Sequence, residues 1–195
     1  MLNKSEAMRR LYNKYIAEFN KEEIVLGKGN LDAKIILVGE APGKDEVRLL
    51  RPFVGIAGKN LDEFLDILEL ERSSIYITNA VKYRLSKINP KTGRVINRPA
   101  TKEDVVTSKE YLQGEINIIK PIYVVTLGNV ALRAVTNDFN VSIGERHGRC
   151  YTIMNNEGFT FKLYPLYHPA SIIYNRNLKS IYIEDILRLR SHVVQ

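Results

Sequence analysis

The stretch from Lys34 to Gly43 reads KIILVGEAPG, in which a short apolar run ends directly in a glycine-rich turn. Its apolar part, Lys34–Val38, is short and rich in branched aliphatic residues, which is typical of a buried strand in a parallel sheet. Three further runs of the same kind follow: Ile75–Thr78, Ile122–Leu127 and Phe161–Leu166. We therefore predict four strands that share one sheet.

Helical patterns alternate with these strands. Apolar residues recur at helical spacing in three segments: Leu61, Phe64, Leu65 and Leu68; Val105, Leu112, Ile116 and Ile119; and a C-terminal segment around Ile183, Ile186 and Leu187. A fourth apolar face precedes the first strand: Met8, Leu11, Tyr12, Tyr15, Ile16 and Phe19. Because alternation of strands and helices implies βαβ crossovers, we predict the α/β class, as a three-layer α/β/α sandwich with a central, mainly parallel four-stranded sheet.

Length and composition bound the class of protein. The chain has 195 residues, the usual length of one domain, so we predict a single domain over residues 1–195. A hydrophobic content of 45% and a charged content of 26% argue against a disordered or fibrous chain. The single cysteine, Cys150, excludes an internal disulfide, and we see no signal peptide or membrane-spanning run. We expect a cytoplasmic monomer without a membrane partner.

Positive charge gathers in one segment of the chain. The formal net charge is +7, and between Lys82 and Lys102 there are seven Lys or Arg residues and no Asp or Glu. We predict that Lys87–Thr101, which contains two prolines and one glycine and has no clean period, is a loop within a basic insertion at about residues 85–101. A local excess of positive charge of this kind is typical of a surface that binds the phosphate backbone of a nucleic acid. A solvated surface loop is an equally good explanation of a run of charges.

Polar residues follow each of the predicted strands. Gly39–Gly43 follows the first strand, Asn79 ends the second, Gly128 and Asn129 follow the third, and His168–Ser171 follows the fourth. Open α/β sheets bind ligands at the carboxyl ends of their strands. We therefore expect one functional crevice at these four exits.

The order of five strings along the chain resembles the uracil-DNA glycosylase superfamily, and specifically the family 4 type. The strings are Val38–Glu46, Arg51–Gly55 with Ala57-Gly58, Tyr76–Lys82, Val125–Gly128 and Tyr167–Ala170. The resemblance implies a monofunctional enzyme of DNA base excision repair. Such an enzyme hydrolyses the N-glycosidic bond of deoxyuridine, releases uracil and leaves an abasic site.

The resemblance assigns acidic and amide side chains to the sugar side of the site. Glu40, with the backbone of Ala41 and Pro42, would lie beside the sugar and the base and hold the attacking water or stabilise the cation. Glu46 would crowd C5 of the base and disfavour the methyl group of thymine. Asn97, in the basic loop, would orient water or Glu46 and act as a poor nucleophile.

Three further residues would hold the flipped base. Phe53 would stack on the uracil ring, and Asn79 would pair with its edge through an amide that both donates and accepts. His168 would hydrogen-bond the uracil oxygen on which negative charge collects. The DNA backbone would be contacted by Lys87, Lys91, Arg94, Arg98 and Ser171.

Structural explanations remain open for three of these residues. Glu40 could be an ordinary acid at a helix N-terminus, where the dipole favours it. Phe53 could be core filler, and His168 could be a satisfied structural histidine.

The chain departs from family 4 at the positions of its iron–sulfur cluster. The resemblance aligns the four cysteine ligands of that cluster with Tyr12, Tyr15, Tyr83 and Ser108. Because such clusters require thiolates, we predict that the protein has no metal and no other cofactor, and that the aromatic residues fill the vacated volume.

Two functional hypotheses follow. The first is an active uracil-DNA glycosylase acting on uracil-containing DNA. The second is a catalytically weak or inactive DNA-binding relative, which the loss of the cluster ligands favours.

Overall fold

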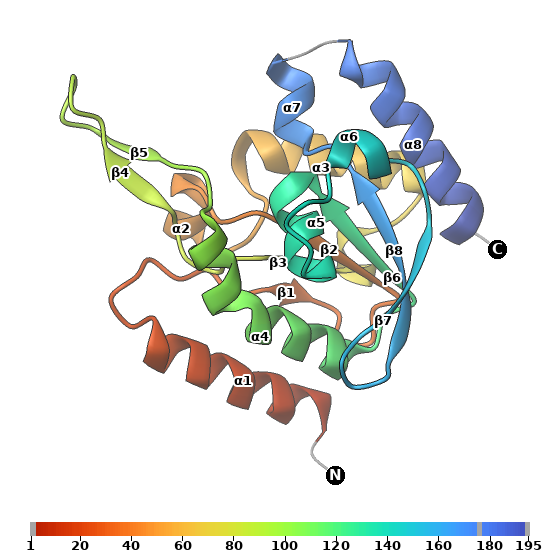
Figure 1. Ribbon diagram of the computed structural model, residues 1–195, viewed down its shortest axis with the longest axis horizontal. Coiled ribbons are helices and arrows are strands. Elements are labelled where there is room, and N and C mark those ends of the chain that lie inside the picture. Colours follow the sequence, from red (N-terminus) through yellow and green to blue (C-terminus); the bar gives the residue numbers. More distant parts are fainter. Residues whose placement is uncertain (1–2, 175–176, 194–195) are drawn as a thin grey trace.

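The computed structural model describes residues 3–174 and 177–193 and has an α/β sandwich at its centre (Figure 1). Its main sheet has the strand order β1-β3-β2-β6-β8-β7. The strands are β1 (Lys28–Gly29), β2 (Ile35–Gly39), β3 (Tyr76–Asn79), β6 (Tyr123–Leu127), β7 (Tyr151–Met154) and β8 (Thr160–Leu166). The inner four strands are parallel, as predicted.

The prediction of a four-stranded sheet was wrong, because an antiparallel strand pairs with each outer edge of the parallel core. β1 pairs with β3 and β7 pairs with β8. Two residues are too few for β1 to show any periodicity. β7 is only partly buried, so it lacks the continuous apolar run on which the prediction relied.

Helices cover both faces of the sheet. α4 (Lys102–Ile119) and α5 (Gly128–Thr136) pack on one face, and α3 (Gly55–Leu68) and α8 (Leu178–Val193) pack on the other. A hydrophobic core lies on each face of the sheet, and successive residues of β2 point into one core or the other. Ile36 and Val38 face α4 and α5, while Ile35 and Leu37 face α3 and α8. The three-layer sandwich is thereby confirmed.

The N-terminal helix α1 (Lys4–Glu18) lies outside the sandwich, alongside α4 (Figure 1). Asn3 caps its start by accepting from the amide of Glu6. Met8, Tyr12 and Tyr15 are buried as the periodicity predicts, whereas Ile16 is exposed. In α8, Ile186 is buried but Leu187 is exposed, so the apolar face of each helix is narrower than its sequence suggested.

The remaining helices are short. They are α2 (Lys44–Leu49), a 3₁₀ turn at Arg72–Ser74, α6 (Ile143–Arg146) and α7 (Pro169–Tyr174). Among the described residues, no helix combines the length and the apolar character needed to cross a membrane.

The segment predicted as a loop at Lys87–Thr101 contains a β-hairpin, so that prediction was wrong. β4 (Ser86–Ile88) pairs with β5 (Val95–Asn97), and the hairpin extends away from the sandwich (Figure 1). Gly93 closes the turn with a φ of +66°, a conformation that favours glycine. Each strand has only three residues and both are exposed, so neither produced a burial pattern in the sequence.

Candidate active site at the strand exits

Gly39, the last residue of β2, lets two predicted base-binding side chains meet. A β-carbon built on Gly39 would lie 2.4 Å from Oδ1 of Asn79 and 2.6 Å from Cζ of Phe53. Asn79 is the residue paired with Gly39 across the sheet, and both Asn79 and Phe53 are buried. Only glycine leaves room for the amide and the ring at this strand exit.

Phe53 is held in an unusual backbone conformation. Its φ is +52°, a region that L residues other than glycine rarely occupy. The guanidinium of Arg72 donates to the carbonyl oxygens of Pro52 and Phe53 and also pairs with Asp62. Arg72 therefore fixes the turn that carries the aromatic ring.

His168 follows β8 and faces the same exits. A β-carbon on Gly128, at the end of β6, would lie 3.2 Å from Cβ of His168, and the His168 and Phe53 rings are 6.2 Å apart between centroids. Burial lowers the pKa of His168 to about 4. Its Nδ1 accepts from the amide of Ala170 at 3.1 Å, so the neutral ring carries its proton on Nε2 and can donate it to a ligand.

Glu40 lies in the turn that leaves β2, followed by half-buried Ala41 and buried Pro42. One oxygen of its carboxylate accepts from the backbone amide of Ala100 at 2.9 Å. This bond joins the turn to the segment between the hairpin and α4. Glu40 is therefore held in place by tertiary contacts, and it does not lie within a helix.

Glu46 and Asn97 meet at Gly43. Glu46 lies in the first turn of α2, and its carboxylate accepts from the amide of Gly43 at 2.8 Å. Burial raises the pKa of Glu46. A β-carbon on Gly43 would lie 2.7 Å from the Glu46 carboxylate and 3.4 Å from the Asn97 amide nitrogen, so the hairpin brings Asn97 to the acidic turn. Asn97 Oδ1 accepts from Arg84 at 3.1 Å.

Of the predicted DNA contacts, Lys87, Lys91 and Arg94 are exposed on the hairpin. Arg98 forms a two-bond ion pair with Asp104, at 2.7 and 3.0 Å, which lowers the pKa of that carboxyl. Ser171 lies in α7, directly after the His168 turn.

Two more members of the basic run are paired with acids from outside it. Lys82 is fully buried, 2.9 Å from Glu115 of α4, and Arg84 forms an ion pair with Glu23. Three cations of the basic run, Lys82, Arg84 and Arg98, therefore have acidic partners, and fewer of its charges are free to meet a ligand than their number in the sequence suggests. Only the tertiary fold reveals these partners, since Glu115 and Glu23 are far from the basic run in sequence.

Lys82 also helps to hold Asn79 in place, a role that the sequence analysis missed. Its Nζ donates to the backbone carbonyl of Asn79 at 3.1 Å, while Glu115 accepts from Thr78 and from the hydroxyl of Tyr12. The sequence did contain a signal for this role: Lys82 comes three residues after Asn79, the last residue of β3, and Glu115 lies on the buried face of a predicted helix. Arg72 gave no comparable signal, because it lies in a short exposed turn.

The four positions aligned with cluster cysteines are buried. Tyr15 packs against Phe19 and Tyr111, and Phe19 stacks on Tyr83, with ring centroids 4.5–5.1 Å apart. The Tyr15 hydroxyl accepts from the amide of Lys82 at 2.9 Å. These side chains do not fit an iron–sulfur cluster, which requires thiolate ligands. In the part of the chain that the structure describes, no group of three or more His, Cys, Asp or Glu is arranged to hold a metal ion.

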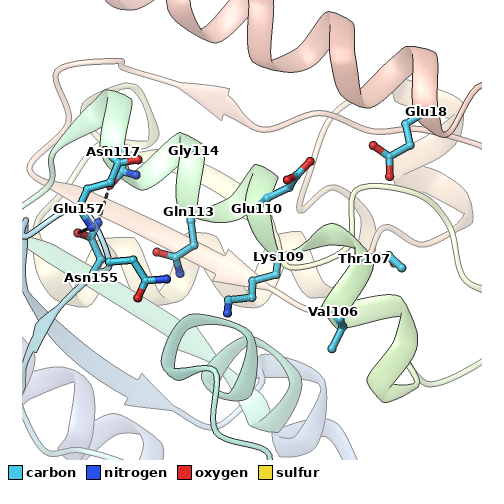
Figure 2. Close-up of a pocket in the computed structure, with 11 residues that line it drawn as sticks. Glu18, Val106, Thr107, Lys109, Glu110, Gln113, Gly114, Asn117, Asn155 and Glu157 are labelled. Carbon is cyan, nitrogen blue, oxygen red and sulfur yellow. Dashed lines mark hydrogen bonds between the residues drawn. The ribbon is translucent and has the colours of Figure 1, made fainter.

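A hollow of about 610 Å³ on another side of the molecule does not belong to this site (Figure 2). It lies along α4 between Glu18 and the turn at Asn155–Glu157. Its walls carry side chains of both charge signs, including Lys109 and Glu110, and the strand exits do not contribute to it.

The strand exits of the sandwich thus bring together an aromatic ring, an amide and an imidazole. Residues 26–188 match the family described as the uracil DNA glycosylase superfamily. The chain therefore belongs to the uracil-DNA glycosylase superfamily.

Its relatives include curated type-4 enzymes. The chain is 35% identical to the type-4 uracil-DNA glycosylase of Thermotoga maritima, over 89% of this chain and 85% of that protein. It is 36% identical to the type-4 enzyme of Archaeoglobus fulgidus, over 87% and 81%. It is 33% identical to that of Saccharolobus solfataricus, over 87% and 76%. The family 4 resemblance is thereby confirmed.

Proposed function

We infer that the protein is a uracil-DNA glycosylase, a DNA repair hydrolase that releases uracil from DNA. The observation that carries this inference is the meeting of Asn79, Phe53 and His168 at the exits of β2, β3 and β8. An aromatic face, an amide and a donating imidazole are the groups that a flipped uracil requires.

The reaction replaces the bond between C1′ of the sugar and N1 of uracil with a bond from C1′ to a water oxygen, and the proton that this water gives up ends on the released uracil. The electrons of the broken bond move to the base, so negative charge grows on uracil while the sugar becomes cationic. A neutral His168 ring can donate a hydrogen bond from Nε2 to the uracil oxygen, and this bond stabilises the negative charge that grows there.

The carboxylates act on the sugar side in this proposal. Glu40 lies on the turn after β2, and Glu46 of α2 and Asn97 of β5 approach the same turn at Gly43. Negative charge there favours the cationic sugar, and an oxygen atom can orient the attacking water. Lys87, Lys91 and Arg94 contact the DNA backbone.

An excision assay tests this function. We expect the purified protein to release free uracil from a uracil-containing oligonucleotide and to leave alkali-sensitive strands. Asn79→Ala and His168→Ala should retain DNA binding and lower the single-turnover rate by about 10²–10³-fold. A folded protein that binds this DNA and releases no uracil would instead support the inactive DNA-binding relative.

We also propose that the protein works without an iron–sulfur cluster. The buried tyrosines at three of the four ligand positions support this proposal, because aromatic packing then occupies the region where the cluster would bind. A native preparation should be colourless and contain no stoichiometric iron or sulfide. Broad visible absorption with matching iron content would contradict the proposal.

A further inference from the structure

The residue that ends the short helix α6 is a histidine that the proposed reaction does not use. Nδ1 of His147 lies 2.7 Å from Oδ2 of Asp185 in α8. Asp185 is buried, whereas the side chain of His147 keeps 24% of its surface exposed. Because a carboxylate accepts hydrogen bonds, Nδ1 is the donor, and the buried acid holds the imidazole in one orientation.

Gly148 lets the carboxylate reach this histidine. A β-carbon on Gly148 would lie 2.0 Å from Oδ1 of Asp185, and the φ of Gly148 is +66°, so only glycine fits here. The amide of Gly148 donates to the carbonyl oxygen of Pro165 in β8 at 2.9 Å. The turn that carries His147 is therefore attached to the strand that leads to His168.

The start of α6 is attached to the neighbouring strand exit. The amide of Ile143 donates at 2.8 Å to the side-chain oxygen of Asn129, which is the second residue after β6. Accordingly, α6 packs against α5 and β8 (Figure 1). Since both ends of this segment are bonded, His147 has a fixed place beside the exits of β6 and β8.

From this place His147 contacts the residue that precedes His168. The rings of His147 and Tyr167 are 4.7 Å apart between centroids and are inclined by 37°. This separation is within the range in which packed rings attract each other. Tyr167 is half-buried, and the next residue, His168, has its ring near Phe53 in the site. A continuous series of contacts thus leads from Asp185 to the turn after β8.

We propose that His147, held by Asp185, is a positioning residue that fixes the turn of His168 through the ring of Tyr167. This inference rests on the proposed function. His168 must aim its Nε2 hydrogen at one oxygen of the base, and a misplacement of about 1 Å can lower a rate by about 10²-fold. A restraint on the residue directly before His168 limits such movement.

The first test separates the imidazole ring from the hydrogen bond. In His147→Asn the amide nitrogen can replace Nδ1 as the donor to Asp185, but the ring that packs on Tyr167 is lost. Single-turnover uracil release at saturating protein should fall about tenfold, while the affinity for DNA stays within about twofold. His192→Asn is the matched control, because His192 is exposed and its carbonyl oxygen bonds Tyr123 at the start of β6.

The tyrosine supplies a second pair of variants. Tyr167→Phe keeps the ring and should retain most of the rate, whereas Tyr167→Ala should lose about tenfold. The double variant His147→Asn, Tyr167→Ala should lose no more than Tyr167→Ala alone, because both changes remove the same contact. Thermal unfolding checks that each variant folds, and the two tyrosine variants decide the question if His147→Asn does not.

NMR titration of the His168 ring is a readout that general stabilisation by His147 would not change. Burial lowers the pKa of His168 to about 4, and a loosened turn would let water reach the ring. The pKa of His168 should therefore rise toward 6.5 in His147→Asn and in Tyr167→Ala, and it should stay near 4 in His192→Asn. This titration uses the protein without DNA.

Three results would contradict the inference. They are unchanged uracil release in His147→Asn and Tyr167→Ala, a lower rate without any change in the pKa of His168, and strictly additive losses in the double variant. An equal fall in the rate of His192→Asn would also contradict it. If wild-type protein releases no uracil while the pKa of His168 shifts as expected, the proposed function fails and the positioning of His168 is still supported.

Discussion

Single atoms decide whether the active-site side chains can meet. Gly39 ends β2 and Gly128 directly follows the neighbouring strand β6, and at both positions a β-carbon would press against a functional residue. The sequence placed Asn79 and His168 at strand exits from a general rule of α/β sheets. It could not indicate the left-handed backbone of Phe53, because that conformation depends on Arg72 from a distant turn.

The low pKa of His168 leads to a prediction at this scale. With a pKa of about 4, the imidazole stays neutral above pH 5, so its protonation should not limit the excision rate near pH 6.5. NMR titration of the His168 ring should give a midpoint near 4. Between pH 6.5 and about 4 the unfolded chain binds more protons at this residue, so its contribution to stability falls as the pH falls through that window.

A His168→Gln variant is the control for that titration, since glutamine does not ionise. A ring midpoint near 6.5 in wild-type protein would contradict the burial argument. So would a rate that drops around pH 6.5 in the wild type and not in the variant.

Among the elements, the start of α4 depends on Arg98. Asp104 accepts from Arg98 and from the amide and hydroxyl of Thr101, which caps the helix. We predict that Arg98→Ala lowers the free energy of unfolding by about 1 kcal/mol at pH 7. Urea unfolding should show this difference shrinking as the pH drops below 3.8, because the pKa of Asp104 is lowered in the folded protein.

Lys91→Ala is the matched control for Arg98, as its side chain is exposed on the hairpin turn. It should leave stability within about 0.5 kcal/mol of the wild type. Equal losses in the two variants would show that the ion pair with Asp104 contributes nothing of its own.

The exposed cations of the hairpin give a second prediction for this element. Lys87→Ala, Lys91→Ala and Arg94→Ala should each weaken binding to every DNA sequence alike. Each should also flatten the plot of log affinity against log salt by about 0.7–0.9. Lys14→Ala on α1 should leave the slope unchanged. Unaltered slopes in all three hairpin variants would mean that these side chains face solvent in the complex.

The hairpin also shows where reading elements from sequence fails. The buried strands and the amphipathic helices could be predicted, since burial imposes a pattern of apolar residues along the sequence. The ribbon of β4 and β5 buries almost nothing, so its pairing depends on the turn at Asn89–Arg94 and left no apolar period to detect.

The whole molecule is joined through one buried charge network. Lys82 and Glu115 are both fully buried, and their hydrogen bonds reach Asn79 in β3 and Tyr12 in α1. We predict that Glu115→Gln lowers the free energy of unfolding by about 3–5 kcal/mol, because it leaves the Lys82 charge without its partner. The double variant Lys82→Met, Glu115→Gln should lose less than the sum of the two single variants, as urea unfolding would show.

Strictly additive losses would contradict this account of the pair. At this scale, the alternation of strand-like and helix-like patterns correctly predicted the fold class, whereas the net charge of +7 did not indicate that individual cations are paired. Pairing between residues distant in sequence becomes visible only once the helices are placed.

The hairpin has an evolutionary consequence. Its base is fixed, because Asn97 must face Gly43 while Arg98 donates its amide to Leu85. The tip of the hairpin is not constrained by such contacts, and a β-carbon on Gly93 would have no atom within 4 Å. Insertions and deletions among homologous genes should therefore fall between Ile88 and Val95. They should also add or remove residues in cross-strand pairs that preserve the alternation, so that natural variation can lengthen the hairpin without moving Asn97.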